Sequence, residues 1–218
     1  MLDKNAAKER FKELYLRHIA TRDLDGQLWA ELERGGFFED PASTKHHLAC
    51  QGGLCVHSLH VYDRLKALCD AEHAKASSFC PSDEAIAICG LLHDVCKMGT
   101  YVLEKKNTKI YDADLVAAQP SLNVKHDSSG AFYWDAVPQY TFQENFAVGH
   151  GSKSVIILQQ YIKLTPEEII AIFHHMGSWG VPQGKELNAL SAVYEANTLA
   201  FLLHVADEMA TYIDERED

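Results

Sequence analysis

Apolar residues recur at helical spacing in the first part of the chain. Between residues 5 and 20 one apolar face is formed by Phe11, Leu14, Tyr15 and Ile19. A shorter pattern covers residues 27–33 and is followed by a pair of glycines at positions 35 and 36, which is typical of a helix C-terminus. The sequence therefore predicts two helices in this region.

Two longer apolar patterns follow. Over residues 54–74 one helical face is predicted to carry Leu54, His57, Val61, Leu65 and Leu68. A second helix is predicted to begin near Ser82, with Asp83 and Glu84 in its first turn, to stay almost wholly apolar to residue 95, and to end at Gly99. The stretch CGLLHDVCKMG, residues 89–99, places His93, Asp94 and Lys97 in this apolar setting.

The pattern changes between residues 100 and 146. TYVLEKKNTKIYD and GAFYWDAVPQYTF are rich in aromatic and β-branched residues, and Asn, Gly and Pro punctuate the region. This composition predicts short antiparallel strands or hairpins.

Helical periodicity then returns over residues 153–164, 165–177 and 188–215. Thr165, Pro166 and Glu168 form the pattern of a capping box with proline in the first turn. The sequence thus predicts a mostly all-α fold in one domain, residues 1–218. It would comprise an N-terminal helical extension over residues 1–43, a helical bundle, and a β-hairpin insert over residues 100–146.

Composition excludes several classes of protein. The formal net charge is −11 and no cluster of basic residues is present, so long nucleic acid is not an expected partner. No stretch reads as an export signal or a membrane span, which favours a cytoplasmic protein that does not bind membranes. Six cysteines without a CxxC pair are expected to be reduced thiols that mostly pack in helices. The oligomeric state is left open.

Seven residues form a candidate metal site. Imidazoles and carboxylates on apolar helices suit a divalent transition metal such as Fe, Mn, Ni, Co or Zn. The candidates are His57, His93, Asp94, His150, His174, His175 and Asp207. A single inward histidine is more often a hydrogen-bonded core residue, and it is the ordered set that favours a metal. His60 can support His57 from one turn away or face solvent, and His126 is expected in a loop. The remaining histidines are interpreted as surface or packing residues.

The set resembles the HD-domain metal-dependent phosphohydrolase superfamily. The resemblance rests on His57 in GGLCVHSLHV, on the doublet His93-Asp94 in LLHDVCK and on Asp207 in LLHVADEMAT, and it covers residues 44–215. His150 and the pair His174-His175 resemble the two-metal branch that includes the HD-GYP phosphodiesterases, although the GYP signature is absent. The turn GHGSKS and the segment FHHMG are similar to uncharacterised bacterial and phage HD hydrolases.

This resemblance implies roles for individual residues. Asp94 would bridge two metals, with His57, His93 and Asp207 on one ion. His150 and either His174 or His175 would hold the other. A metal-activated hydroxide would then cleave a phosphomonoester or phosphodiester of a nucleotide-like substrate. Lys97 is expected to contact the phosphate, and the alternative for this residue is a solvated position at a helix end. Lys153 is a second candidate for the phosphate contact.

Two other functions remain open from the sequence. The chain could be a nucleotide-binding or regulatory module with little turnover. It could also be a structural metal protein in which an ion joins helices through a closed coordination sphere. One ion or two, and a monoester or a diester substrate, are equally left open.

Overall fold

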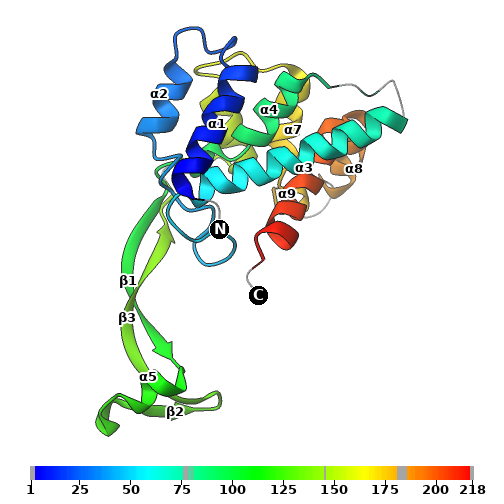
Figure 1. Ribbon diagram of the computed structural model, residues 1–218. Helices are drawn as coiled ribbons and strands as arrows, with labels where there is room; N and C mark the ends of the chain where they lie inside the picture. The colour runs from blue at the N-terminus through cyan, green and yellow to red at the C-terminus, as the bar shows by residue number, and fades with distance from the viewer. Residues whose placement is uncertain (1–2, 76–78, 80, 145, 181–185, 217–218) are drawn as a thin grey trace.

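The computed structural model describes residues 3–75, 79, 81–144, 146–180 and 186–216. Within these ranges the protein is mostly helical, with one small antiparallel sheet (Figure 1). The helical body consists of α1 (Lys4–His18), α2 (Gln27–Arg34), α3 (Gly53–Lys75), α4 (Asp83–Leu92), α6 (His150–Leu158), α7 (Pro166–His174), α8 (Glu186–Ala196) and α9 (Thr198–Met209).

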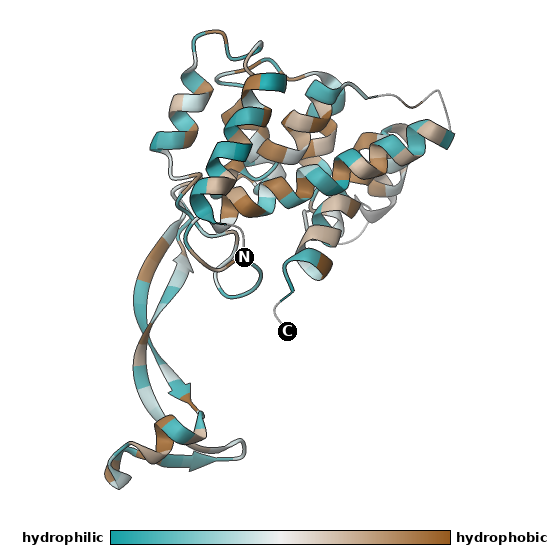
Figure 2. Ribbon diagram, in the orientation of Figure 1, coloured by the Kyte–Doolittle hydropathy of each residue, from teal (hydrophilic) through white to brown (hydrophobic). Residues whose placement is uncertain are grey.

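Helix α3 is the central element of the body. It packs against α1, α4 and α9, and its predicted inner face is confirmed, since Leu54, Val61 and Leu65 are fully buried. Figure 2 shows hydrophobic and hydrophilic residues alternating along the helices of the body. Burial of such faces supplies most of the stability of helices of this length.

Helix α4 is shorter than the sequence suggests. Ser82 caps its first turn by accepting the Ala85 N–H, as predicted, but the helix ends at Leu92 rather than at Gly99. His93 is the C-cap, and a 3-10 turn (Val95–Lys97) follows Asp94. Successive residues of an α-helix point about 100° apart. Ending the helix here allows the adjacent side chains of His93 and Asp94 to reach the same site.

Helices α6 and α7 meet near their ends. The capping box of α7 is present: Thr165 accepts the Glu168 N–H, and the Glu168 carboxylate accepts the Thr165 N–H. Helix α6 begins at His150 and ends at Leu158, so the predicted helix over residues 153–164 was wrong in both bounds. Ile162 and Leu164 are still buried, because the connection beyond Leu158 packs into the core. Apolar spacing alone could not distinguish that connection from helix.

The predicted C-terminal helix over residues 188–215 was also wrong, because it is broken. Helix α8 ends at Ala196, and Asn197 caps α9 by accepting the Ala200 N–H. The two segments are bent by 107°. A π-helical turn (Ala210–Asp214) follows α9 and returns the chain to α3, which places the Glu215 side chain in the interior.

The predicted β-rich insert is confirmed as a sheet of order β1-β3-β2. Strand β1 (Tyr101–Ile110) pairs antiparallel with β3 (Gly130–Phe142), and β2 (Lys125–Asp127) pairs with the start of β3. The short helix α5 (Ala113–Ala117) packs against β3. The β1–β3 ribbon projects from the helical body (Figure 1). His126 therefore lies in a strand and not in the predicted loop.

Two further expectations concern disulfides and membrane spans. Four buried cysteines in the described ranges are free thiols, namely Cys55, Cys69, Cys89 and Cys96, and Cys80 lies outside those ranges. In the same ranges no single helix is long and apolar enough to cross a bilayer. One bent pair, residues 189–196 with 198–214, meets that criterion only when its two helices are counted together.

Gly151 fixes the distance between α6 and α7. A Cβ atom at this position would lie 2.2 Å from the Phe173 carbonyl oxygen and 2.7 Å from that of Ile172, which is closer than backbone atoms allow. We expect Gly151→Ala to force the two helices apart and to cost about 1–3 kcal/mol of unfolding free energy, as overpacking does. The neighbouring Ser152→Ala is the control. Denaturant unfolding of both variants tests this, and equal stabilities would contradict the close packing.

Candidate metal centre

Six side chains from five parts of the helical body converge on one point. His57 comes from the first turns of α3, His93 and Asp94 from the end of α4, and His150 from the start of α6. His175 caps the end of α7, and Asp207 lies on α9. His57, His93, Asp94 and His175 are buried, whereas His150 and Asp207 are partly exposed. The predicted site residues are thus brought together, with His174 as the exception described below.

Two of the histidines are held in one orientation by backbone carbonyls. The Nδ1 atom of His93 lies 3.0 Å from the Gly90 oxygen, and the Nδ1 atom of His175 lies 2.7 Å from the Ile172 oxygen. A carbonyl only accepts hydrogen bonds, so each Nδ1 carries a proton, and in the neutral form of each ring Nε2 carries the lone pair. Both Nε2 atoms are buried and have no hydrogen-bond partner among the described residues.

His57 is oriented by a carboxylate. Its Nδ1 atom lies 3.0 Å from Oε1 of Glu215, and the same oxygen lies 2.9 Å from Nδ1 of His60. The Nε2 atom of His57 faces Asp207 Oδ1 at 3.2 Å without hydrogen-bond geometry. Carboxylate-held imidazoles of this kind are common around metal ligands, where they fix the ring and raise its basicity. His60 therefore supports His57 through Glu215, which is one of the two positions that the sequence left open for it.

The two oxygens of Asp94 face different groups of histidines. Oδ2 lies 3.6 Å from the Nε2 atoms of both His57 and His93. Oδ1 lies 2.5 Å from Nε2 of His150 and 3.5 Å from Nε2 of His175. A carboxylate placed in this way can bridge two adjacent cations.

Ligand atoms within metal-binding reach of one another form overlapping sets. One set is His57, His93 and Asp207, and another is His93, Asp94 and His175. A further set joins Asp94 and His150 with Cys96. Burial raises the pKa of the Cys96 thiol to about 12, so without metal this sulfur stays protonated at neutral pH, and a metal ion would have to displace its proton.

Charges in the centre are strongly coupled. Burial alone would raise the pKa of Asp94, but Lys97, His93 and His150 hold it well below its usual range. Lys97 forms an ion pair with Asp94, with its Nζ 2.7 Å from Asp94 Oδ2, and its own pKa is raised despite burial because of this carboxylate. Burial lowers the pKa of His93 to about 4, so this imidazole is neutral at physiological pH.

His175 belongs to the cluster and its neighbour His174 does not. The His174 ring packs against Phe173 and lines a different cavity, formed by α7, α8 and the Asn197 turn. The sequence left the choice between the two open, because both close the same helix. The structure places His175 next to Asp94 and separates His174 from it.

Lys153 is not at the cluster surface. It is buried on α6 with its Nζ 3.3 Å from Glu144. Lys97 and Lys153 were both candidates for a phosphate contact, and only Lys97 lines the cavity over the candidate ligands.

Sequence reasoning missed three neighbours of the centre. Glu215 orients His57 and His60, Cys96 contacts the His150 ring, and His47 packs its ring 5.1 Å from that of His57. His47 had been interpreted as a surface or packing histidine. Glu215 lies eight positions after Asp207, but Glu208 and Asp214 lie between them, so the sequence alone did not single it out. The spacing did not reveal that the π-helical turn buries it.

A cavity of about 210 Å³ lies over the cluster. It gives access to Asp94, Lys97 and Asp207, and the exposed ring of Trp179 lies at its edge. The full lining is His47, Asp94, Lys97, Met176, Trp179, Asp207, Glu208, Thr211 and Tyr212. Small molecules can therefore reach the carboxylates of the centre.

The residues present fit a divalent transition metal. Buried ring nitrogens without hydrogen-bond partners are costly, and native proteins rarely leave them unsatisfied. Three such Nε2 atoms, from His57, His93 and His175, lie around two buried or partly buried carboxylates. Imidazole nitrogens with carboxylate oxygens are the donor set of Mn, Fe, Co, Ni and Zn sites.

Comparison with known proteins adds no relative. No family model, no curated protein and no solved structure matches this chain.

Loss of a ligand should remove the metal. We expect His93→Ala and Asp94→Ala each to abolish binding of a transition metal, because each side chain belongs to the shared part of the cluster. His174→Ala is the matched control, since it removes an imidazole one residue from His175 but outside the cluster. Elemental analysis of the three variants and of wild type measures this. Full metal content in Asp94→Ala would contradict the site, as would loss of metal in His174→Ala.

Metal affinity should rise with pH. Burial favours the neutral form of His57, but its contacts with Asp207 and Glu215 outweigh burial and raise its pKa to about 10. Without metal the ring is therefore protonated at pH 7, and a cation at Nε2 must displace that proton. The metal-bound state holds fewer protons, so affinity should increase by about tenfold per pH unit below that pKa for each proton displaced. Calorimetric titration with Ni²⁺ from pH 6.5 to 8.5, in buffers of different ionisation enthalpy, tests this. Affinity that stays constant without proton release would contradict it.

Proposed function

We propose that this protein is a metal-dependent phosphohydrolase of the HD type. Its substrate would be a small phosphorylated molecule, with a nucleotide-like compound favoured. The observation that carries the proposal is the set of buried, unpartnered imidazole Nε2 atoms around Asp94. The resemblance in LLHDVCK and LLHVADEMAT supports the same conclusion independently of the geometry.

Access to the centre favours an enzyme over a structural metal protein. A structural site closes all positions around its ion with protein ligands, whereas a catalytic site keeps one open for water or substrate. Here the cavity reaches Asp94 and Asp207 from outside. A bound metal would lower the pKa of a coordinated water and polarise a phosphoryl oxygen.

The chain's own residues would orient the reaction. Asp94 would hold the charge at the centre through both of its oxygens. Lys97 lines the cavity and remains charged at neutral pH, because its pKa is raised by Asp94 despite burial. Its ammonium would bind a phosphoryl oxygen and stabilise the negative charge that grows in the transition state. Glu215 would keep the His57 ring fixed while this happens.

The arrangement of Asp94 favours two ions over one. His57 and His93 are near one oxygen, while His150 and His175 are near the other. Paired ions about 3.5–4 Å apart clamp both the attacking and the leaving oxygen of a phosphate ester. Fe, Mn, Ni, Co and Zn remain candidates, since their preferred ligands overlap.

Lys97→Ala separates a phosphohydrolase from a helix-joining metal protein. We expect turnover to fall by about 10²- to 10³-fold, as for loss of one preorganised donor to a developing charge. Metal content should be preserved, because the ammonium is not a ligand. The assay is a metal-supplemented screen of aryl phosphates, nucleotides and cyclic nucleotides, followed by kinetics on whichever is cleaved, with metal content and melting temperature for each variant.

Two results would count against the proposal. If the metal-loaded wild type hydrolyses no ester, the remaining candidate functions are a binding module and a structural metal protein. Full activity in Lys97→Ala would reject the phosphate contact. Lys105→Ala, which removes an exposed charge from strand β1, is the control for a general effect of charge.

A further inference from the structure

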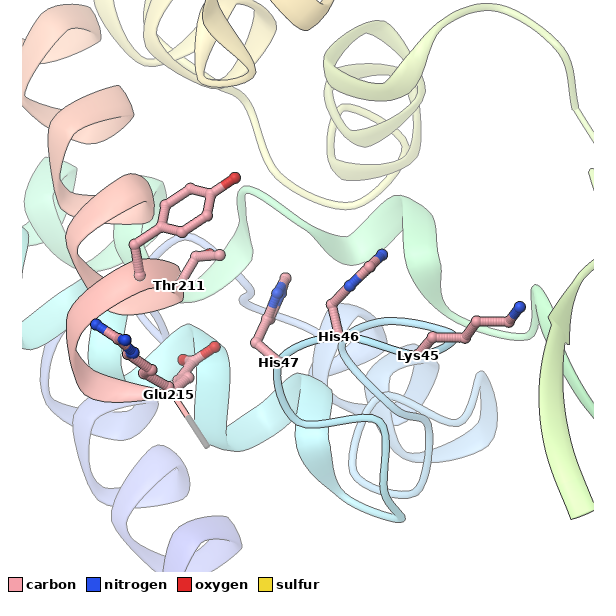
Figure 3. Close-up of a pocket in the computed structure, with 7 residues that line it drawn as sticks. Lys45, His46, His47, Thr211 and Glu215 are labelled. Atoms are coloured by element: carbon pink, nitrogen blue, oxygen red, sulfur yellow. The ribbon is translucent and has the colours of Figure 1, made fainter. Parts of the chain in front are cut away.

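A second and larger cavity adjoins the first. Its volume is about 540 Å³, and it shares His47, Thr211 and Tyr212 with the cavity over the metal centre. The remaining lining residues are Lys45, His46, Glu215 and Arg216. Figure 3 shows Lys45, His46 and His47 following one another along the loop, with Thr211 and Glu215 on the other side of the cavity. One ligand can therefore extend from Lys97 through the shared residues into the second cavity.

The exposed charges of this cavity are positive in a chain whose net charge is −11. Lys45 and Arg216 are exposed, and neither side chain forms an ion pair with another residue that the structure describes. Arg216 is unusual in this respect. The other arginines each contact a carboxylate, namely Arg10, Arg17, Arg22, Arg34 and Arg64.

The single carboxylate in the lining does not neutralise these charges. The Glu215 side chain is fully buried, and its oxygens face His57 and His60. Its negative charge is therefore compensated inside the protein. His47 adds a buried Nε2 atom that has no partner among the described residues, at the boundary between the two cavities.

These groups suit an anion and disfavour a further cation. An arginine fork and a lysine ammonium donate charge-assisted hydrogen bonds to phosphate oxygens, and imidazole and hydroxyl groups add neutral donors. His47, His57 and Glu215 lie close enough together to hold a metal, but Lys45 and Arg216 at the same cavity would repel it. A cleft with walls of one sign also concentrates ions of the opposite sign.

We propose that this cavity binds a second phosphate group of the substrate, through Lys45, His46 and Arg216. The inference rests on the proposed function, and it narrows the substrate to multiply phosphorylated small molecules such as nucleoside polyphosphates or bisphosphates. One phosphate lies at Lys97 and the metal centre. The other lies beyond His47 and Tyr212, in the second cavity.

Binding without turnover tests the cavity directly. Inorganic tripolyphosphate is titrated into wild type and into Lys45→Ala, Arg216→Ala and the double variant, with EDTA present to prevent metal-dependent hydrolysis. Each single change should weaken binding by roughly tenfold, the usual effect of one charge-assisted hydrogen bond. Lys105→Ala, on the projecting ribbon, removes the same charge and should bind as wild type does.

Kinetics then test the role in substrate choice. Two ratios are measured in wild type and in the double variant. The first is kcat/KM for adenosine 3′,5′-bisphosphate divided by kcat/KM for adenosine 5′-monophosphate, and the second is the same ratio for adenosine 5′-diphosphate. We expect wild type to prefer one of the two doubly phosphorylated compounds by at least about tenfold. The double variant should lose that preference. Whichever compound is preferred identifies whether the two phosphates are separated or directly linked.

The possible failures are distinguishable. If wild type and the double variant bind tripolyphosphate equally, the cavity is not a phosphate site, whether or not any ester is hydrolysed. If tripolyphosphate binding depends on Lys45 and Arg216 but no ester is hydrolysed, the anion site stands and the proposed hydrolase fails. Equal preference ratios in an active enzyme would overturn the role in substrate choice.

Discussion

The charge of one buried carboxylate determines how this site is built. Asp94 is almost completely removed from water, and an isolated ion in that position would be prohibitively costly. Lys97 and His150 contact its two oxygens, and three further imidazoles surround it. His93 and Lys97 lie on the same segment as Asp94, whereas the other three imidazoles come from α3, α6 and the end of α7, so the packing of the body brings most of the imidazoles to this carboxylate.

The charges of the ionisable side chains indicate how a bound ion would change the net charge of the centre. Asp94, Asp207 and Glu215 contribute three negative charges, whereas Lys97 and a protonated His57 contribute two positive ones. One divalent ion that displaces the His57 proton would make the group neutral. A second divalent ion would give it two positive charges, which matches the dianion of a phosphate monoester. The electrostatics of a two-ion site are therefore suited to binding that substrate.

The sequence predicted the helices better than it predicted where they end, and most residues of the candidate site lie at helix ends. Periodicity identified α3 and α4, because their apolar faces repeat over several turns. It extended α4 to Gly99, although the helix stops at Leu92 so that His93 and Asp94 can face the same centre. It also ran α8 and α9 together, because Asn197 was not recognised as a helix cap. Helix caps and helix breaks depend on single residues, and the repeating pattern of apolar positions does not identify them.

The candidate ligands were predictable where the surroundings were apolar along the chain. His57, His93 and Asp207 stand out in this way, since each interrupts a hydrophobic helix. The choice between His174 and His175 was not predictable, because adjacent residues at a helix end differ only in the direction they take in space. Glu215 was missed for a related reason: it lies in the charged stretch DERED, which is typical of an exposed segment, and only the π-helical turn brings its side chain beneath His57.

The proposed phosphate site in the second cavity would allow an acidic protein to select an anionic ligand. A surface with an overall negative charge repels long polyanions over their whole length, and salt screens such repulsion only beyond about 8–10 Å. A small phosphorylated molecule meets the local field instead. In the second cavity the exposed charges are those of Lys45 and Arg216, while Glu215 is buried and paired. In the first cavity Lys97 lies beside Asp94, Asp207 and Glu208, so a positive field there would depend on bound metal. This distribution of charge is the one expected if the ligand is a small phosphorylated compound, as proposed.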